Sequence, residues 1–283
     1  MATHIITDGS SDLPEALRAA WDIRVVPLGV RFGEEQFDST MKHSEFYDRM
    51  RASDALPQTS SPSPHAFMEA YRQVPEGDDI LVLALSSQVS STYQHAMLAR
   101  EMLREERSGG GEIEVIDSRT ASMGLGGIAY KAAKLAKSGV PFAVVAQEAR
   151  RLVRETRTHF VLDTLENVIR GGRLDKMRGA VASMLNIKLL MHANEQGAIE
   201  VLEKARGSAN AVRRLVDRIE DAKGETAGQL LAVAHSRCEE RAEALVRAIL
   251  ERFPFAEVVV SDMGPVIGTY AGEGGLLISY ERS

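Results

Sequence analysis

Residues 79–85, DILVLAL, form a nearly continuous apolar run that ends abruptly in the hydroxyl-rich segment SSQVSSTY. A run this short and this apolar is typical of a strand that is covered on both faces of a parallel sheet. Apolar runs at 4–7 and 112–118 have the same character, and stretches with helical spacing separate the three runs. Because strands that alternate with helices pair in parallel, we predict an α/β fold with a Rossmann-like parallel sheet in the N-terminal part.

The second half of the chain has a different pattern, in which two strand-like stretches flank the turn sequence NEQG at 194–197. This arrangement predicts a β-hairpin, and three further strand-like stretches follow it. A length of 283 residues suits one large domain or two modest ones. We predict two: an N-terminal α/β domain at 1–155 and a C-terminal α+β domain at 156–283.

Hydroxyl side chains are concentrated where the strand predicted at 79–85 ends. They are Ser86, Ser87, Ser90, Ser91 and Thr92, followed by the phenol of Tyr93. The other two predicted strands also run into hydroxyl-rich segments, TDGSSD and IDSRTAS, and QTSSPSP precedes a predicted helix. Ligands of parallel sheets bind beyond the carboxyl ends of the strands. These segments therefore predict an anion or carboxylate site, and helix capping by serine and threonine is the alternative.

Several other kinds of site lack the residues that they require. The net charge of −6 argues against nucleic acid as the main partner. The segment GLGGIA at 124–129 lies too far behind its strand for a dinucleotide fingerprint, and we interpret it as small residues on a tightly packed helix. The seven histidines show no metal-ligand spacing, and G-x-S-x-G is absent. We expect no cofactor and no bound metal.

The single cysteine, Cys238, excludes a disulfide framework within the chain and is interpreted as a structural residue. The N-terminal segment has no pattern of a signal peptide, and no apolar run reaches the ~18 residues of a membrane span. We therefore expect a cytoplasmic protein without stable membrane insertion, and transient contact with a membrane stays open.

Two segments have more than one interpretation. The first is basic and contains Arg170, Arg173, Lys176, Arg178, Lys204 and Arg206. These residues form either a solvated helix face and hairpin end or an exposed patch for a phosphate-bearing or acidic partner. The second segment is the glycine-rich 264–275, which is either a flexible loop or backbone that passes close to a ligand or to other backbone.

Taken in order along the chain, these segments resemble the motifs of the DegV family of bacterial fatty-acid-binding proteins. The motifs are TDGSSDLP, QTSSPSP, SSQVSSTYQHA, VIDSRTASMGLG, LENVIRGGRLDK, LNIKLLMH with EKARG, and GPVIGTYAGEGG. Each motif is weak alone, but together they are specific. They occur in the family's order from Thr7 to about Leu277, which is nearly the whole chain.

The resemblance implies two α/β domains with a long-chain fatty acid between them, its tail buried and its carboxylate at hydroxyl-rich loops. Members of the family present this carboxylate to a separate fatty acid kinase, which uses ATP to make acyl phosphate, so the chain itself is expected not to be an enzyme. The carboxylate ligands are expected at Thr59 in TSSP, with Ser60 as a neighbour, and at Ser90 in VSSTY. Arg173 in GGR and Arg206 in EKAR fall where the family has basic residues at the pocket mouth or partner surface.

The chain departs from the family pattern at several positions. Ser91 replaces the glycine of S-G-T-Y, and Ser61 replaces the glutamine of T-S-Q-P. Tyr270 replaces the histidine of G-P-V-I-G-x-H, and GEG at 272–274 replaces G-P-G. A phenol can donate a hydrogen bond to a carboxylate, but unlike histidine it does not titrate near neutral pH. Any binding of the carboxylate by Tyr270 would therefore use a neutral hydroxyl.

Three functional hypotheses follow. The first is a non-catalytic carrier, in which burial of the tail supplies ~0.8 kcal/mol per CH₂ and neutral hydroxyls hold the carboxylate without a salt bridge. The second is a hydrolase or acyltransferase that uses Ser90, for which His95 is the only neighbouring base in sequence. The third is a regulatory module that binds an acidic protein through the basic residues at 170–178.

Overall fold

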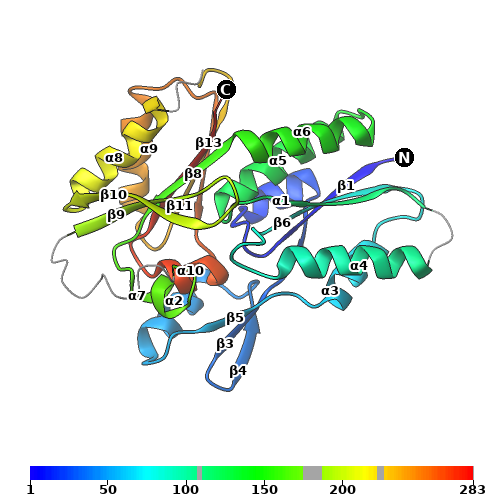
Figure 1. The fold of residues 1–283 in the computed structure, drawn as a ribbon, viewed down its shortest axis with the longest axis horizontal. Coiled ribbons are helices and arrows are strands. Elements are labelled where there is room, and N and C mark those ends of the chain that lie inside the picture. The colour runs from blue at the N-terminus through cyan, green and yellow to red at the C-terminus, as the bar shows by residue number, and fades with distance from the viewer. Residues whose placement is uncertain (107–109, 175–186, 222–225, 283) are drawn as a thin grey trace.

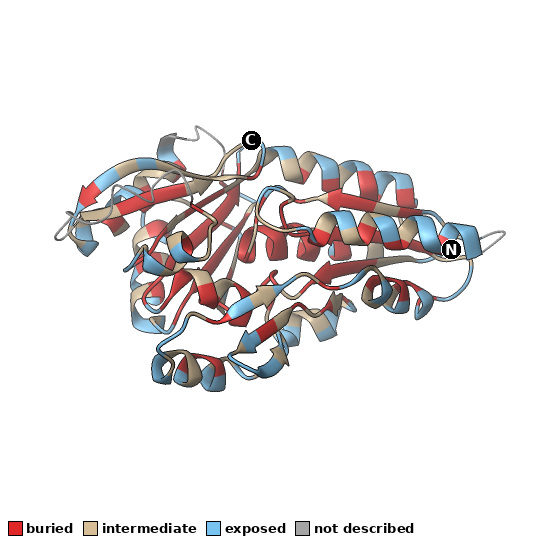
Figure 2. Ribbon diagram, turned by 60° about the horizontal axis from the view of Figure 1, so that its bottom comes forward, coloured by how far each residue is buried: buried red, intermediate tan, exposed pale blue. Residues whose placement is uncertain are grey.

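The structure is a computed structural model that describes residues 1–106, 110–174, 187–221 and 226–282. Within these ranges the chain forms three sheets, of four, six and three strands. The two larger sheets lie side by side along the long axis, and helices cover their faces (Figure 1). Buried residues follow the strands and the inner faces of the helices, whereas exposed residues follow the outer faces (Figure 2).

The four-stranded sheet is parallel throughout and has the strand order β2-β1-β6-β7. Its strands are β1 (Thr3–Asp8), β2 (Arg24–Val26), β6 (Asp79–Ala84) and β7 (Ile113–Asp117). One face is covered by α3 (Pro64–Arg72) and α4 (Thr92–Glu106). The other is covered by α1 (Glu15–Trp21), α5 (Met123–Lys137) and α6 (Phe142–Glu155). Every residue of β6 is buried, which confirms the prediction of a parallel sheet with helices on both faces.

The six-stranded sheet is mixed and has the order β10-β9-β8-β13-β11-β12. Its strands are β8 (Thr156–Val161), β9 (Ile187–Ala193), β10 (Ile199–Arg206), β11 (Leu230–His235), β12 (Glu257–Asp262) and β13 (Leu276–Glu281). Strands β11 and β12 pair in parallel, and the other neighbours pair antiparallel. Its outer face is covered by α8 (Ser208–Asp221) and α9 (Glu239–Leu250). The predicted hairpin is confirmed as β9 and β10.

Helix α5 packs against both large sheets and carries the glycine-rich segment at 124–129. At Gly126 an added Cβ would lie 2.5 Å from the carbonyl oxygen of Ser11, and Gly127 faces Ala232 of β11. The interpretation of these glycines as packing positions is therefore confirmed. One apolar core runs from the four-stranded sheet through α5 to the six-stranded sheet.

A third sheet, of β3 (Gly29–Phe32), β4 (Glu35–Asp38) and β5 (Gln58–Ser60), is missing from the sequence-based prediction. The segment QTSSPSP was expected as a loop, but its first three residues form β5, which pairs antiparallel with β3. The β3–β4 hairpin projects from the body of the molecule (Figure 1). This small sheet brings β5 to the end of the cavity described below.

Residues 264–275 form the helix α10 (Pro265–Ala271) and a turn in which Gly272 and Gly274 have positive φ. The alternative of a flexible loop is therefore wrong, and close packing is the reason for at least one glycine. At Gly268 an added Cβ would lie 2.6 Å from Tyr47 Oη of α2 (His43–Ala52).

Helix α10 also packs against α7 (Glu166–Arg170), after which residues 175–186 lie outside the described residues. The structure therefore describes only the beginning of the basic segment at 170–178, for which a solvated helix face was one alternative. Across the described ranges, no helix combines the length and the apolar character that crossing a membrane requires.

Candidate functional site

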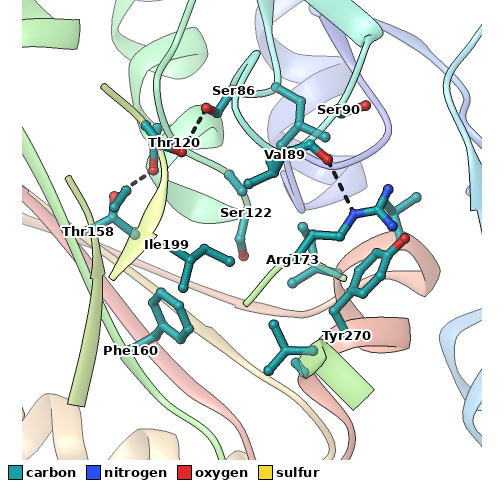
Figure 3. Close-up of a pocket in the computed structure, with 18 of the residues that line it drawn as sticks. Ser86, Val89, Ser90, Thr120, Ser122, Thr158, Phe160, Arg173, Ile199 and Tyr270 are labelled. Carbon is teal, nitrogen blue, oxygen red and sulfur yellow. Dashed lines mark hydrogen bonds between the residues drawn. The ribbon is translucent and has the colours of Figure 1, made fainter. Parts of the chain in front are cut away.

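A cavity of about 350 Å³ lies where the two large sheets and the small sheet meet. Its volume falls within the range of about 300–1,000 Å³ that is typical of small-molecule sites. Most of the wall is apolar and includes Leu85, Phe160, Leu162, Val266, Ile267 and Leu277. Polar side chains line two separate parts of the wall. Figure 3 shows Arg173 and Tyr270 on one side of the pocket and Thr120 and Thr158 on the other.

The first polar part, here called the hydroxyl cluster, consists of Thr59, Ser61, Ser90, Ser91 and Tyr270. Thr59 Oγ1 and Tyr270 Oη share a hydrogen bond of 2.5 Å. Ser61 Oγ lies 2.9 Å from Ser90 Oγ and 3.0 Å from Ser91 Oγ. The cluster therefore joins three segments that are far apart in sequence: β5, the start of α4 and α10.

The segment directly before α4 supplies two serines of the hydroxyl cluster, Ser90 and Ser91. Ser90 Oγ accepts a hydrogen bond of 3.3 Å from the Thr92 amide and shares another of 2.8 Å with Thr92 Oγ1. Ser90 thus takes part in the capping that was the alternative explanation for these hydroxyls, and it also lines the cavity. Because the N-terminus of a helix carries partial positive charge and unpaired N–H groups, this end of the cavity favours an anion.

Ser60 does not line the cavity, although it was expected as a carboxylate ligand next to Thr59. Side chains alternate between the two faces of a strand, so Thr59 and Ser61 face the cavity and Ser60 turns the other way. Ser60 Oγ occupies the space that a side chain at Gly29 of β3 would need. In the sequence, Ser61 is distinguished only as a departure from the family pattern. Its place two residues after Thr59 is the signal that could have identified it.

Arg173 lines the same end of the cavity and has only neutral partners among the described residues. Its Nε donates to the Val89 carbonyl at 3.3 Å and its Nη1 donates to the Gly171 carbonyl at 2.6 Å. Its guanidinium lies over the Tyr270 ring, 4.7 Å from the centroid (Figure 3). Of the two positions expected for Arg173, the pocket mouth or a partner surface, the structure places it at the cavity beside the hydroxyl cluster.

The second polar part of the wall contains the buried residues Ser86, Thr120, Ser122 and Thr158. Their hydroxyls are engaged within the protein. Ser86 Oγ donates to the Gly197 carbonyl at 2.8 Å, and Thr120 Oγ1 shares a bond of 2.8 Å with Thr158 Oγ1. Ser122 Oγ donates to the Asp12 carboxylate at 2.5 Å. These hydroxyls hold parts of the fold together.

The remaining basic residues of the sequence analysis do not line the cavity, as far as the structure describes them. Arg206 is exposed at the end of β10, and Arg170 pairs at 3.0 Å with Glu166 of its own helix. Lys176 and Arg178 lie outside the described residues. Within the described ranges, the basic segment therefore places Arg173 at the cavity.

The structure describes the residues on which the other sequence-based hypotheses depend, namely His95, the metal-ligating side chains and Cys238. His95, the expected base for Ser90, lies 2.7 Å through Nδ1 from the carbonyl oxygen of Pro62. The described ranges contain no group of three or more His, Cys, Asp and Glu side chains suited to a metal ion. Cys238 donates to the Gly275 carbonyl at 3.3 Å, and burial raises the pKa of its thiol. Its interpretation as a structural residue is consistent with this environment.

Comparison with known proteins shows similarity along the whole chain. The family model described as "Uncharacterised protein, DegV family" matches residues 2–282. A DegV family protein from Ruminococcus gnavus, whose structure was refined with vaccenic acid, is 31% identical, with a TM-score of 0.91 and 99% of each chain covered. A DegV family protein from Thermus thermophilus, described by its fatty acid binding, is 29% identical, with a TM-score of 0.89 and full coverage of both chains.

The fatty acid kinase B3 protein of Streptococcus pneumoniae, whose structure is loaded with linoleic acid, is also similar. It is 26% identical, with a TM-score of 0.88 and full coverage of both chains. These similarities extend over both large sheets and agree with the order of motifs found in the sequence. The chain belongs to the DegV family.

Proposed function

We propose that the protein binds a long-chain fatty acid in the cavity, with the tail along the apolar wall and the carboxylate at the hydroxyl cluster beside Arg173. The observation that carries this proposal is the meeting of an apolar cavity with neutral donors and one arginine at a single end. Relatives from Ruminococcus gnavus and Thermus thermophilus are described with a fatty acid or by their binding of one. In this proposal the acid lies between domains at 1–155 and 156–283, since both ranges line the cavity.

The two ends of the ligand contribute differently to its affinity. Burial of the tail contributes ~0.8 kcal/mol per CH₂, so most of the binding free energy comes from the apolar wall. The carboxylate orients the ligand, because the only charged side chain of the described cavity wall is Arg173. Thr59, Ser90 and Tyr270 are the neutral donors that we assign to the carboxylate oxygens.

The protein acts, in this proposal, as a carrier that presents the carboxylate to a separate fatty acid kinase. One similar structure is named as a fatty acid kinase B3 protein. Ser91 of the hydroxyl cluster is exposed, so the carboxylate end of the cavity lies near the surface. The hydrolase alternative lacks support, because the hydrogen-bond partners of Ser90 are Ser61 and Thr92 and not His95.

Extraction and mass spectrometry of the protein purified from bacteria test the binding proposal. We expect a fatty acid in stoichiometric amount. The proposal would be contradicted if the purified protein contained no fatty acid and also took up no added hexadecanoic acid. Ser90→Ala removes a hydrogen bond to a charged group and should weaken binding about tenfold or more. Ser87→Ala is the matched control, because Ser87 belongs to the same loop but does not line the cavity.

The kinase part of the proposal needs a separate experiment. The protein loaded with hexadecanoic acid should yield acyl phosphate with ATP only when a fatty acid kinase is added. Reversal of the exposed charge in Arg206→Glu should lower this transfer without changing fatty acid affinity, if Arg206 belongs to the partner surface. Transfer at the wild-type rate would show that Arg206 does not belong to the partner surface.

A further inference from the structure

Asp12 is a buried carboxylate that the fatty acid site does not use directly. It follows β1, and it joins this part of the chain to the segment between β12 and α10. Asp12 Oδ1 accepts a hydrogen bond of 2.8 Å from the Gly264 amide, and the Asp12 carbonyl accepts one of 2.5 Å from Ser261 Oγ. Gly264 directly precedes α10, the helix that carries Tyr270. Asp12 therefore fixes the start of α10 relative to the parallel sheet.

The other carboxylate oxygen of Asp12 reaches the wall of the cavity. Asp12 Oδ2 accepts a hydrogen bond of 2.5 Å from Ser122 Oγ, and Ser122 lines the cavity beside Met263. Both residues adopt a backbone conformation of positive φ that is unfavourable for any residue with a side chain, with φ of 52° at Asp12 and 54° at Ser122. Residues other than glycine adopt a positive φ only where contacts with the surrounding structure offset the strain. The Asp12–Ser122 pair is such a contact.

Two titratable groups act directly on the charge of Asp12, His43 of α2 and Asp262 of β12. His235 of β11 in turn pairs with Asp262, and Arg18 of α1 acts on the charge of His43. His43 Nδ1 lies 3.6 Å from Asp262 Oδ2, and His235 Nδ1 lies 3.4 Å from Asp262 Oδ1. Burial raises the pKa of Asp12 to about 7, although the hydrogen bond from Ser122 opposes this shift. The bond to Asp262 raises the pKa of His43.

We propose that ionised Asp12 is a positioning residue that holds α10 and the Ser122 wall in the acyl-binding arrangement, and that its protonation loosens this arrangement and speeds release of the acid. This inference rests on the proposed function. Protonated Asp12 donates its O–H to Ser122 Oγ, so the direction of that hydrogen bond reverses. The hydroxyl proton of Ser122 then turns away from Asp12, and the Gly264 amide keeps a neutral acceptor in place of a charged one.

The expected effect is a rate of release that rises as the pH falls. A hydrogen bond to an ionised acceptor is about twice as strong as one to a neutral acceptor. From this difference we expect hexadecanoic acid to leave about fivefold faster at pH 6 than at pH 8. Release can be followed by transfer of the acid to a fluorescent acceptor vesicle of neutral phospholipid.

The substitution Asp12→Asn copies the protonated state without a titration. The amide oxygen of asparagine accepts from Gly264, and its NH₂ group donates to Ser122. We expect this variant to release the acid at the fast rate throughout the range from pH 6 to pH 8. Asp78→Asn is the control, because Asp78 lies at the opposite end of the parallel sheet and bonds His4 and the Ala2 amide. It should keep the wild-type profile.

Two results would overturn the inference: a wild-type rate that does not change with pH, or an Asp12→Asn variant that keeps the wild-type profile. If Asp12→Asn does not fold, Ser122→Ala provides a second test. It removes a donor that favours the ionised form of Asp12, so the midpoint of the pH profile should move upward. An unmoved midpoint would also overturn the inference.

Amide hydrogen exchange of the acid-free protein separates this inference from the proposed function. After correction for intrinsic exchange, residues 261–268 should lose protection from pH 8 to pH 6 in the wild type but not in Asp12→Asn. Equal behaviour of the two proteins would contradict the role of Asp12. Failure to bind hexadecanoic acid at any pH would instead contradict the proposed function and leave the exchange result as the test of Asp12.

Discussion

The guanidinium of Arg173 lies 4.7 Å from the centroid of the Tyr270 ring, and the two residues together line one end of the cavity. Gly171 permits this contact, because a Cβ there would lie 2.5 Å from Tyr270 Cε1. The ring attracts the cation without neutralising it. Val89 and Gly171 contribute carbonyl oxygens, which also leave the charge in place. Arg173 is thereby held in position to bind an anion.

The first prediction concerns the charge of Arg173. Arg173→Gln should weaken hexadecanoic acid binding by about tenfold or more, because a hydrogen bond to a charged group is lost. Binding of hexadecanol, which has the same tail and no charge, should change much less. Arg170→Gln is the control, since Arg170 pairs with Glu166 away from the cavity. Equal losses for the acid and the alcohol would show that Arg173 acts through packing and not through charge.

A second prediction separates the ring of Tyr270 from its hydroxyl. Tyr270→Phe keeps the ring under Arg173 but removes the hydrogen-bond partner of Thr59. Titration with hexadecanoic acid should show a loss of about threefold to tenfold, as expected for one hydrogen bond. Tyr270→His should instead make binding tighter as the pH falls through about 6.5, because the imidazole becomes charged. A pH-independent Tyr270→His variant would place residue 270 away from the carboxylate.

The third prediction compares two neighbouring serines. Ser61→Ala should weaken fatty acid binding, because Ser61 Oγ joins Ser90 and Ser91 at the cavity. Loss of one neutral hydrogen bond corresponds to about 1 kcal/mol, or about fivefold in affinity. Ser60→Ala should leave affinity unchanged, because Ser60 is exposed on the opposite face. The reverse order of effects would mean that the register of β5 differs from that described.

The sequence predicted those elements whose pattern is local. The strand β6 and its hydroxyl-rich end were recognisable because a short, continuous apolar run is typical of a buried strand in a parallel sheet. The hairpin of β9 and β10 was recognisable from its turn residues. By contrast, β5 has three polar residues and no apolar alternation, so only its pairing with β3 makes it a strand.

The candidate site was less predictable because its contacts join distant parts of the chain. Thr59 and Tyr270 are separated by 211 positions and share a hydrogen bond. The sequence could not indicate the hydrogen-bond partner of each hydroxyl at the cavity wall. Ser122 illustrates this, since it belongs to the hydroxyl-rich IDSRTAS but donates to Asp12. Pairings of this kind depend on the relative position of the two sheets, which no local pattern records.

A fourth prediction concerns stability in acid. Burial is the main reason that the pKa of His159 is lowered from 6.5 to about 3, and its ring stacks on His192 and Tyr280. The pKa of His159 is lower in the fold than in the unfolded chain. Above about pH 6.5 the histidine is neutral in both states, so it does not lower the free energy of unfolding there. Stability is lost as the pH falls from there toward 3, by about 2 kcal/mol between pH 7 and pH 5.

Urea unfolding at pH 7 and pH 5 measures this loss. His159→Gln should reduce the difference between the two free energies of unfolding by about 2 kcal/mol, even if the variant is less stable at both values. His65→Gln is the control, because the side chain of His65 is exposed. If His159→Gln keeps the full wild-type difference, the acid sensitivity comes from other groups.

The last prediction uses two adjacent glycines of α5 that differ in what surrounds them. At Gly126 an added Cβ would lie 2.5 Å from the backbone oxygen of Ser11, which cannot move without shifting the loop that contains Asp12. Gly126→Ala should therefore destabilise the protein by about 1–3 kcal/mol. At Gly127 the nearest atom would be Leu230 Cδ2 at 3.5 Å, an ordinary contact. Gly127→Ala should be neutral or stabilising by up to about 1 kcal/mol, since alanine favours a helix interior.

Urea unfolding of both variants measures the difference in their free energies of unfolding. Equal effects would mean that α5 is not held against the loop after β1 as closely as the structure indicates.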